Sequence, residues 1–485
     1  MRIQDARIQW KYVQWIPLLL CAAILAGGLV NHMVQWERME EFRTLHTRAV
    51  YACLICVSIL FFKKETSISR LLSAYFLWLL VNRILLGDVS DSLRGELRCA
   101  AGMCLACKLG SALDAGGRRT LLRCFTGVVV GIFSLWAICG LRVVLTDVGE
   151  IPLFDLTIHL NDELQDTGIL RYLEFFLIHR NLSAAWFMIG LWLVIAQWPG
   201  CKHILCRFVL TCLGILMYLM IALQHCRSVY VGTAIGFGML TVLLLKDQKP
   251  NWKCGTRLAI IAIAALSSML LVYKGFSVCN QVMVTFAGFS EQAQEQPPAE
   301  EGEPVPEQKE DPIPQETAVP ETLLTEPPET APPENAAQLM DNRSFFRDLL
   351  TLTMRTEVWG AVSQTLRTHP EFLLLGQPEG EISENLHRYG GMTRPIAHTH
   401  NTLTQALSLC GIPGLLLLLA ILVPLIPRLI RCFFGGAEIT ERILTIPLTC
   451  LLIYGVIEPM FSSFLEFSSL CFMLLAGMVS SADKP

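Results

Sequence analysis

The chain has 485 residues, of which 53% are hydrophobic and only 16% are charged, and its formal net charge is −4. Soluble domains carry about 25% charged residues, whereas the mean hydropathy of this chain is +0.48. The composition therefore excludes a soluble domain with a single anchor and indicates an integral membrane protein.

Apolar runs of roughly 17–25 residues are typical of membrane-spanning helices, and the sequence contains about twelve. They lie near 14–30, 47–62, 71–87, 96–112, 124–145, 183–199, 204–223, 229–245, 257–274, 402–426, 443–459 and 464–481. The fourth is the weakest, because it contains Arg98 and Lys108. The first lacks a clear small-residue cleavage site, so we interpret it as a span and not as a cleaved signal peptide.

Basic residues collect in alternate connections between these runs. The basic stretches are the N-terminus, 63–70, 116–123, 201–207, 246–257 and 428–442. Since Lys and Arg mark cytoplasmic loops, we expect these stretches and both termini to face the cytoplasm. The connections between them, two of which are long, should then face outward.

The spans and loops predict five regions. These are an N-terminal membrane bundle at 1–145, a first long outer loop at 146–182, central membrane helices at 183–274, a second long outer loop at 275–401 and C-terminal membrane helices at 402–485. Within the second loop, 291–334 holds thirteen Asp or Glu, one Lys and eleven prolines. Such a segment cannot bury a core, so we expect a disordered acidic insert; its charge of −12 leaves +8 for the rest of the chain.

A first polar stretch, QHCRSVYVGTAIGFGML at 224–240, joins two spans on the predicted outer face. Arg227 lies at the start of the second span, where the helix dipole adds to its positive field and favours an anion. Ser228 is a candidate helix cap, and the following glycines would let the helix pack closely. The alternative is an interfacial arginine that only contacts lipid phosphates.

A second polar stretch covers 343–380 in the second long loop and reads as an amphipathic helix ending near His369–Pro370. A loop built on Gly376, Pro378 and Gly380 should follow. Arg355 and Trp359 are four residues apart and should share a helix face. A helix lying on the membrane without any catalytic role would show the same pattern.

The third stretch, IAHTHNTLTQALSLCGIPGLLLLLA at 396–420, leads into a span. Asn401 is suited to cap the helix beginning at Thr402, which leaves His400 just outside the helix start. The helix dipole disfavours the charged form of a histidine there, so His400 should be neutral. A neutral imidazole could accept a proton. His398 and His400 would face different ways on a helix, although an extended segment could bring them together at a metal. A histidine that only marks the membrane interface is the alternative.

Together these stretches give a more specific pattern. His400–Asn401, nine residues, Gly411, two residues and Gly414 form the spacing H-N-x9-G-x-x-G. It resembles that of the O-antigen ligase and polymerase superfamily, bacterial membrane glycosyltransferases that act on lipid-linked glycans. Three other stretches of this chain also resemble motifs of the family. They are Arg227 at the outer end of a middle span, Arg355-x-x-x-Trp359 in a long outer loop, and a shorter outer loop that ends at Arg180–Asn181. Two departures are the acidic insert and Ser-Val after Arg227, where the family often has Gly.

The resemblance implies an all-α fold of the GT-C type. It also implies a polyprenyl-pyrophosphate-linked glycan donor, an acceptor hydroxyl at the outer face of the bacterial plasma membrane, membrane lipids as surroundings and no nucleic-acid partner. His400, Arg227 and Arg355 would be catalytic, with His400 as base and the arginines on the pyrophosphate. Arg180, Asn181, Trp359, His398 and Asn401 would bind substrate.

No D-x-D pair occurs in the sequence, so we expect inverting chemistry without a metal or other cofactor. A transporter or flippase of lipid-linked glycans is the main alternative, for which Glu458 and the charged fourth span are the only indications. Another outer-face enzyme, such as an acyltransferase or intramembrane protease, is the third. The sequence leaves open which glycan is handled and whether the acceptor is a glycan, a lipid or a wall polymer.

Overall fold

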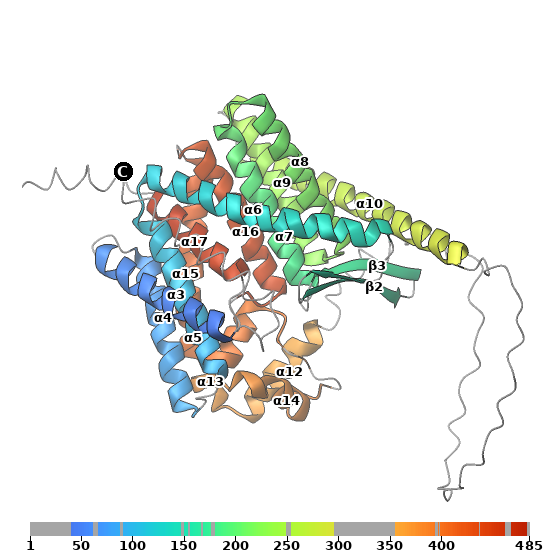
Figure 1. Cartoon of the computed structure of the whole chain (residues 1–485). Helices are drawn as coiled ribbons and strands as arrows, with labels where there is room; N and C mark the ends of the chain where they lie inside the picture. The colour runs from blue at the N-terminus through green and yellow to red at the C-terminus, as the bar shows by residue number, and fades with distance from the viewer. Residues whose placement is uncertain are drawn as a thin grey trace, which may run out of the picture.

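The computed structural model describes most of the chain outside its N-terminus and the acidic insert. The described residues are 40–61, 66–87, 91–146, 150–153, 156–165, 168–175, 180–248, 254–294, 355–392, 396, 398–435, 437–460 and 467–482. The predicted first span at 14–30 lies outside them, as does the acidic segment beyond residue 294. Long helices form a bundle, with a small sheet and a group of short helices at its margin (Figure 1).

Helices account for most of the described residues. They are α3 (Glu40–Phe61), α4 (Ser67–Leu85), α5 (Asp91–Ala112), α6 (Ala115–Thr146), α7 (Arg180–Gln197), the 3₁₀ turn η3 (Trp198–Gly200), α8 (Ile204–Leu223), α9 (Arg227–Gln248), α10 (Cys254–Gln294), α12 (Arg355–Thr368), α13 (Phe372–Leu375), α14 (Glu379–Arg388), α15 (Thr402–Phe434), α16 (Ile439–Ile457) and α17 (Phe467–Ala482). Apart from the span at 14–30, each predicted span falls on one of them. This confirms a mostly helical membrane protein.

Eight helices among the described residues are long and apolar enough to cross a membrane. The apolar parts of α3 and α17 are shorter, and α5, which carries the weakest predicted span, does not qualify. The predicted number of spans therefore stays a prediction. α10 also continues to Gln294, past the end at 274 that we predicted for its span.

The segment that we predicted as the first long outer loop contains a sheet that the sequence analysis missed. Strands β1 (Glu150–Leu153), β2 (Leu156–Gln165) and β3 (Gly168–Phe175) pair in antiparallel order, with Ile158 opposite Phe175. Apolar and polar residues alternate along β2, as they do in a strand with one buried face. Ile158, Leu173 and Phe175 are fully buried. The Phe175 ring packs against Gly140 of α6.

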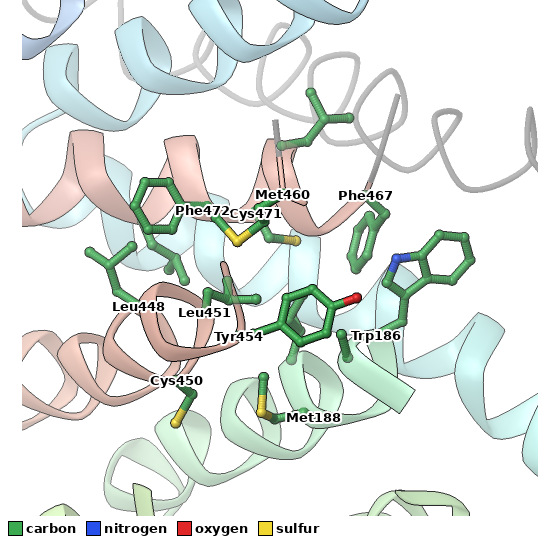
Figure 2. Close-up of a cluster of buried hydrophobic side chains, with 14 of the residues drawn as sticks. Trp186, Met188, Leu448, Cys450, Leu451, Tyr454, Met460, Phe467, Cys471 and Phe472 are labelled. Carbon is green, nitrogen blue, oxygen red and sulfur yellow. The ribbon is translucent and has the colours of Figure 1, made fainter. Parts of the chain in front are cut away.

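α16 lies at the centre of the bundle, against α7, α9, α15 and α17. Figure 2 shows the apolar cluster formed there by Trp186 and Met188 of α7, Leu448, Leu451 and Tyr454 of α16, and Phe467, Cys471 and Phe472 of α17. Glycines of α9 confirm the predicted close packing: a Cβ on Gly236 would lie 2.9 Å from Cys450 Sγ, and one on Gly238 would lie 2.6 Å from the Ile261 carbonyl oxygen.

Two glycines with left-handed backbones bring α13 and α15 into direct backbone contact. Gly411 has φ +65° and interrupts α15, while Gly376, at the end of α13, has φ +73°. A Cβ on Gly411 would lie 2.4 Å from the Leu374 carbonyl oxygen, and one on Gly376 would lie 2.4 Å from the Leu409 carbonyl carbon. The backbone N–H of Gln377 also donates to the Ser408 carbonyl at 2.8 Å.

The C-terminal half of α4 holds this junction. Trp78 Nε1 donates to the Cys410 carbonyl at 2.9 Å. Asn82 donates to the Leu375 carbonyl, and the buried Arg83 donates to the Gln377 carbonyl at 3.1 Å. Since these acceptors are backbone groups beside the two glycines, α4 fixes how α13 sits on α15.

Several of the basic stretches meet at one end of the bundle. Arg118 pairs with Glu441 at 2.6 Å and donates to Ser481 Oγ at 3.1 Å. Arg428 donates to Ser67 Oγ at 2.9 Å, and a Cβ on Gly200 would lie 3.9 Å from Arg123 Nη2. The stretches predicted to share a membrane face are therefore neighbours, while the cytoplasmic assignment of that face stays a prediction.

Gly411→Ala should lower stability in detergent more than Gly391→Ala does. Both glycines have positive φ, +65° and +75°, but a Cβ on Gly391 would meet nothing within 4 Å. In the control, Gly391→Ala, backbone strain alone should lower the free energy of unfolding by about 1–2 kcal/mol. In Gly411→Ala, overpacking against Leu374 should lower it by about 1–3 kcal/mol more. Thermal unfolding followed by circular dichroism measures both, and equal losses would contradict the backbone contact.

A cysteine replacing Glu384, which is exposed on α14, should react with an impermeant maleimide in intact cells. Native Cys201 and Cys206 lie in a basic stretch and should react only after lysis. Labelling is read peptide by peptide with mass spectrometry, so the native cysteines serve as internal references. The reverse pattern would overturn the predicted orientation.

Candidate active site

The segment before α15 presents two histidines. Asn401 caps α15 as predicted, because its side chain accepts from the backbone N–H groups of Leu403 and Thr404 at 2.7 and 3.2 Å. His400 has φ +51°, and the fully buried Thr399 precedes it. A left-handed residue other than glycine costs free energy and persists where its surroundings impose it. The imidazole of His400 therefore has a defined position outside the helix.

Glu458 is the polar centre of the site. It follows the last residue of α16 and is 3% exposed. Its Oε1 accepts from Arg355 Nη2 at 2.7 Å and from Asn181 Nδ2 at 2.9 Å. Its Oε2 lies 3.4 Å from His400 Nδ1. Side chains from α7, α12, α16 and the segment before α15 thus meet on one carboxylate.

Arg355 is the first described residue of α12 and also donates through Nε to the Ile457 carbonyl at 3.2 Å. Two of its nitrogens therefore contact the end of α16. Trp359, one turn later, donates through Nε1 to the Thr399 carbonyl at 3.1 Å. The predicted shared face of Arg355 and Trp359 is confirmed, and it faces Glu458 and the histidine segment.

Arg180 and Asn181 begin α7, as the predicted end of the shorter loop required. The Arg180 guanidinium lies 4.4 Å from the centre of the Tyr172 ring, a cation–π contact with the sheet. Cys226 Sγ lies 3.9 Å from the Asn181 carbonyl, and Arg227 follows it as the first residue of α9. Burial raises the pKa of the Cys226 thiol to about 11. The negative charge of Glu458 also acts to raise this pKa, whereas the positive charge of Arg180 acts to lower it.

The environment of Glu458 contains opposing electrostatic effects. Burial acts to raise the pKa of the Glu458 carboxyl, but the hydrogen bond from His400 and the charges of His400 and Arg355 outweigh it and hold the pKa below its ordinary value of 4.5. A buried carboxylate without such partners would be strongly disfavoured. Glu458 is therefore an anion at neutral pH.

His398 and His400 are not arranged as they would be on a helix. Their segment is non-helical, and the two ring centroids are 4.2 Å apart. His398, His400 and Glu458 each offer one ligand atom, and these atoms lie within 4.8 Å of one another. The two histidines therefore lie together in a segment that is neither helical nor extended, because the backbone of His400 is left-handed.

Several details differ from the sequence predictions. α9 begins at Arg227, so Ser228 lies inside its first turn and does not cap it; its hydroxyl lies 3.2 Å from Cys226 Sγ. Gly380 is the second residue of α14 and not part of the loop after Gly376. Glu458, considered only as a charge within a span, instead lies at a helix end.

Glu458 was missed as a site residue although the sequence contains a signal for it. A lone carboxylate stands between apolar residues and directly precedes Pro459. A residue before proline is biased away from the helical region, which predicts a helix end there. An ionisable residue inside a predicted span is a candidate functional residue by default.

The helices and this ionisable cluster define a membrane protein with a candidate active site at the helix ends. Residues 212–419 match a family model described as O-antigen ligase, Wzy_C. The match over these residues supports the predicted O-antigen ligase and polymerase superfamily, and this family suggests a glycosyltransferase-like role in glycan processing. The match includes Arg227, Arg355 and His400 but neither Asn181 nor Glu458. A search of curated proteins finds no match.

Glu458→Gln should lower stability most at neutral pH and least in acid. The pKa of Glu458 in the folded protein is below 4.5, so its carboxylate stabilises the fold at pH values above 4.5. This contribution to stability is lost as the pH falls through the folded pKa. The amide cannot pair with Arg355 as an ion, and the expected cost is on the order of 1–3 kcal/mol at pH 7. Unfolding of both proteins between pH 7 and about pH 3 measures this, because the contribution is lost below pH 4.5; a difference that grows in acid would contradict the assignment.

Proposed function

We propose that the chain is a membrane glycosyltransferase with a GT-C-like fold. It transfers or polymerises a polyprenyl-pyrophosphate-linked glycan onto an acceptor hydroxyl at the outer face of the bacterial plasma membrane. The observation that carries the proposal is the single carboxylate of Glu458, which contacts Arg355, Asn181 and His400 from three distant parts of the chain.

His400 acts as the general base. When its Nδ1–H donates to Glu458 Oε2, which lies at 3.4 Å, the other ring nitrogen carries the lone pair that accepts a proton. Glu458 also stabilises the imidazolium that forms. Catalytic hydrogen bonds are often long before substrate binds. General base catalysis contributes about 10²–10⁴ in rate.

Arg355 and Arg227 stabilise the leaving pyrophosphate. The Arg355 Nε and Nη2 contacts with α16 fix the guanidinium plane and leave its other N–H groups for phosphate oxygens. Guanidinium groups stay charged throughout and bind such oxygens bidentately. Arg227 begins α9, where the helix dipole adds to its field. Arg180, at the start of α7, binds the same substrate from the side of the sheet.

The remaining assigned residues position these groups or the glycan. Asn401 caps α15, and its Nδ2 donates to the Val456 carbonyl at 2.7 Å, which ties the histidine segment to the end of α16. Trp359 holds Thr399 from the other side. Asn181 fixes the Glu458 carboxylate, and His398, whose ring lies beside that of His400, binds the substrate.

The reaction needs no metal in this scheme. The acceptor oxygen forms a bond to the anomeric carbon as its proton passes to His400. The bond from that carbon to the pyrophosphate oxygen breaks, and polyprenyl pyrophosphate leaves. Attack opposite the leaving group inverts the anomeric centre.

His400→Ala should lower turnover by roughly 10²–10⁴ with donor binding largely retained, because it removes the base. Arg355→Lys keeps the charge but loses the planar fork, so it should also impair turnover. Arg388→Lys is the matched control, since Arg388 is exposed and pairs with Glu384 within α14. His398→Ala should be milder than His400→Ala.

The assay uses proteoliposomes with a lipid-linked oligosaccharide and measures new glycan linkage and lipid movement separately. Movement without linkage would favour the transporter alternative. Full linkage activity in His400→Ala would contradict the proposed base.

A further inference from the structure

The segment His398–Thr399–His400 directs two imidazoles to one side. The Thr399 N–H donates to Gln405 Oε1 at 2.9 Å, its carbonyl accepts from Trp359, and its side chain is fully buried. The backbone turns at His400, which has φ +51°, and the two imidazole ring centroids lie 4.2 Å apart. Anchoring Thr399 in the protein therefore leaves both histidines on the side of Glu458.

The three side chains form a metal-ligand set. One ligand atom from each of His398, His400 and Glu458 lies within 4.8 Å of the others, so a small movement of the side chains would bring them around one ion. Two imidazoles with one carboxylate are typical of Zn²⁺ sites that keep an open position. Ring nitrogens favour Zn²⁺, Co²⁺, Ni²⁺ or Cu²⁺ over Mg²⁺ and Ca²⁺, which prefer oxygen.

The two oxygens of Glu458 have different partners. Oε1 is held by Arg355 and Asn181, and Oε2 faces His400. Outer partners of this kind orient a metal-binding carboxylate. Both imidazoles are partly exposed, so an ion can reach them from solvent.

We propose that His398, His400 and Glu458 bind a divalent transition-metal ion of the Zn²⁺ type, and that the bound ion inhibits transfer. A neutral imidazole that coordinates an ion through one nitrogen carries its proton on the other. His400 then has no lone pair for the acceptor proton. The inhibition rests on the proposed function, whereas the binding does not.

The first experiment titrates Co²⁺ into the full-length, chelator-treated chain in nanodiscs and follows its d–d absorption, with Zn²⁺ as competitor. Wild type should bind one ion through nitrogen and oxygen ligands. His398→Ala should lose affinity by at least about 10-fold. His203→Ala is the matched control, because His203 is exposed in a basic stretch and makes no side-chain cap; its affinity should equal that of wild type.

Equal Co²⁺ affinity in wild type and His398→Ala would overturn the site, as would a spectrum dominated by sulfur-to-cobalt charge transfer from cysteines. Glu458→Gln should also weaken Co²⁺ binding. If Glu458→Gln misfolds, His398→Ala still tests the site, because His398 is only half-buried.

The second experiment measures glycan linkage with added Zn²⁺ and then with chelator. Zn²⁺ should inhibit wild type reversibly and should inhibit His398→Ala only at concentrations at least about 10-fold higher. Equal inhibition of both proteins would contradict the proposal. Binding of Co²⁺ to wild type without any inhibition by Zn²⁺ would support the ion site and contradict His400 as the base.

Discussion

A buried carboxylate at the end of a central helix must be compensated, because an unpaired charge in such a place is strongly disfavoured. Glu458 is 3% exposed, and its compensation comes from α7, α12 and the segment before α15. These elements depend on one another, because every partner that reaches Glu458 reduces the free-energy cost of burying its charge. The stability of the helix ends and the arrangement of the candidate active site thus depend on the same group.

A second constraint fixes the direction from which His400 reaches Glu458. Because Gly411 interrupts α15, the turns from Thr402 to Cys410 form a segment of their own. This segment is docked on α13 by Gly376 and held by Trp78 of α4, whose indole N–H donates to the Cys410 carbonyl at 2.9 Å. Gly411, the first glycine of the H-N-x9-G-x-x-G pattern, therefore positions the short helical segment that follows the histidines, which is a more specific role than close helix packing.

Sequence reasoning predicted the features that depend on local pattern. Hydropathy predicted the helices, and the Asn401 cap and the Arg355–Trp359 face follow from spacing along one helix. Glu458 could not be assigned its role in this way, because its partners lie 58, 103 and 277 residues away in the chain. The sheet was missed for a different reason: its alternation was present in the sequence, but an outer connection between spans was interpreted as a loop. The pairing of His398 with His400 depends on the left-handed backbone of His400 and the burial of Thr399, which spacing alone does not determine.

The two carboxylate oxygens of Glu458 have different partners, and this has a consequence for the proposed reaction. Oε1 faces the residue that would bind the leaving group, and Oε2 faces the residue that would take the acceptor proton. When the pyrophosphate draws the Arg355 guanidinium toward itself, the ion pair at Oε1 weakens and more of the carboxylate charge is left to stabilise a protonated His400. Proton uptake by His400 would in turn release Arg355 toward the developing negative charge. One buried carboxylate can thus couple leaving-group stabilisation to base catalysis without moving a helix, since both partners shift only at the level of side-chain hydrogen bonds.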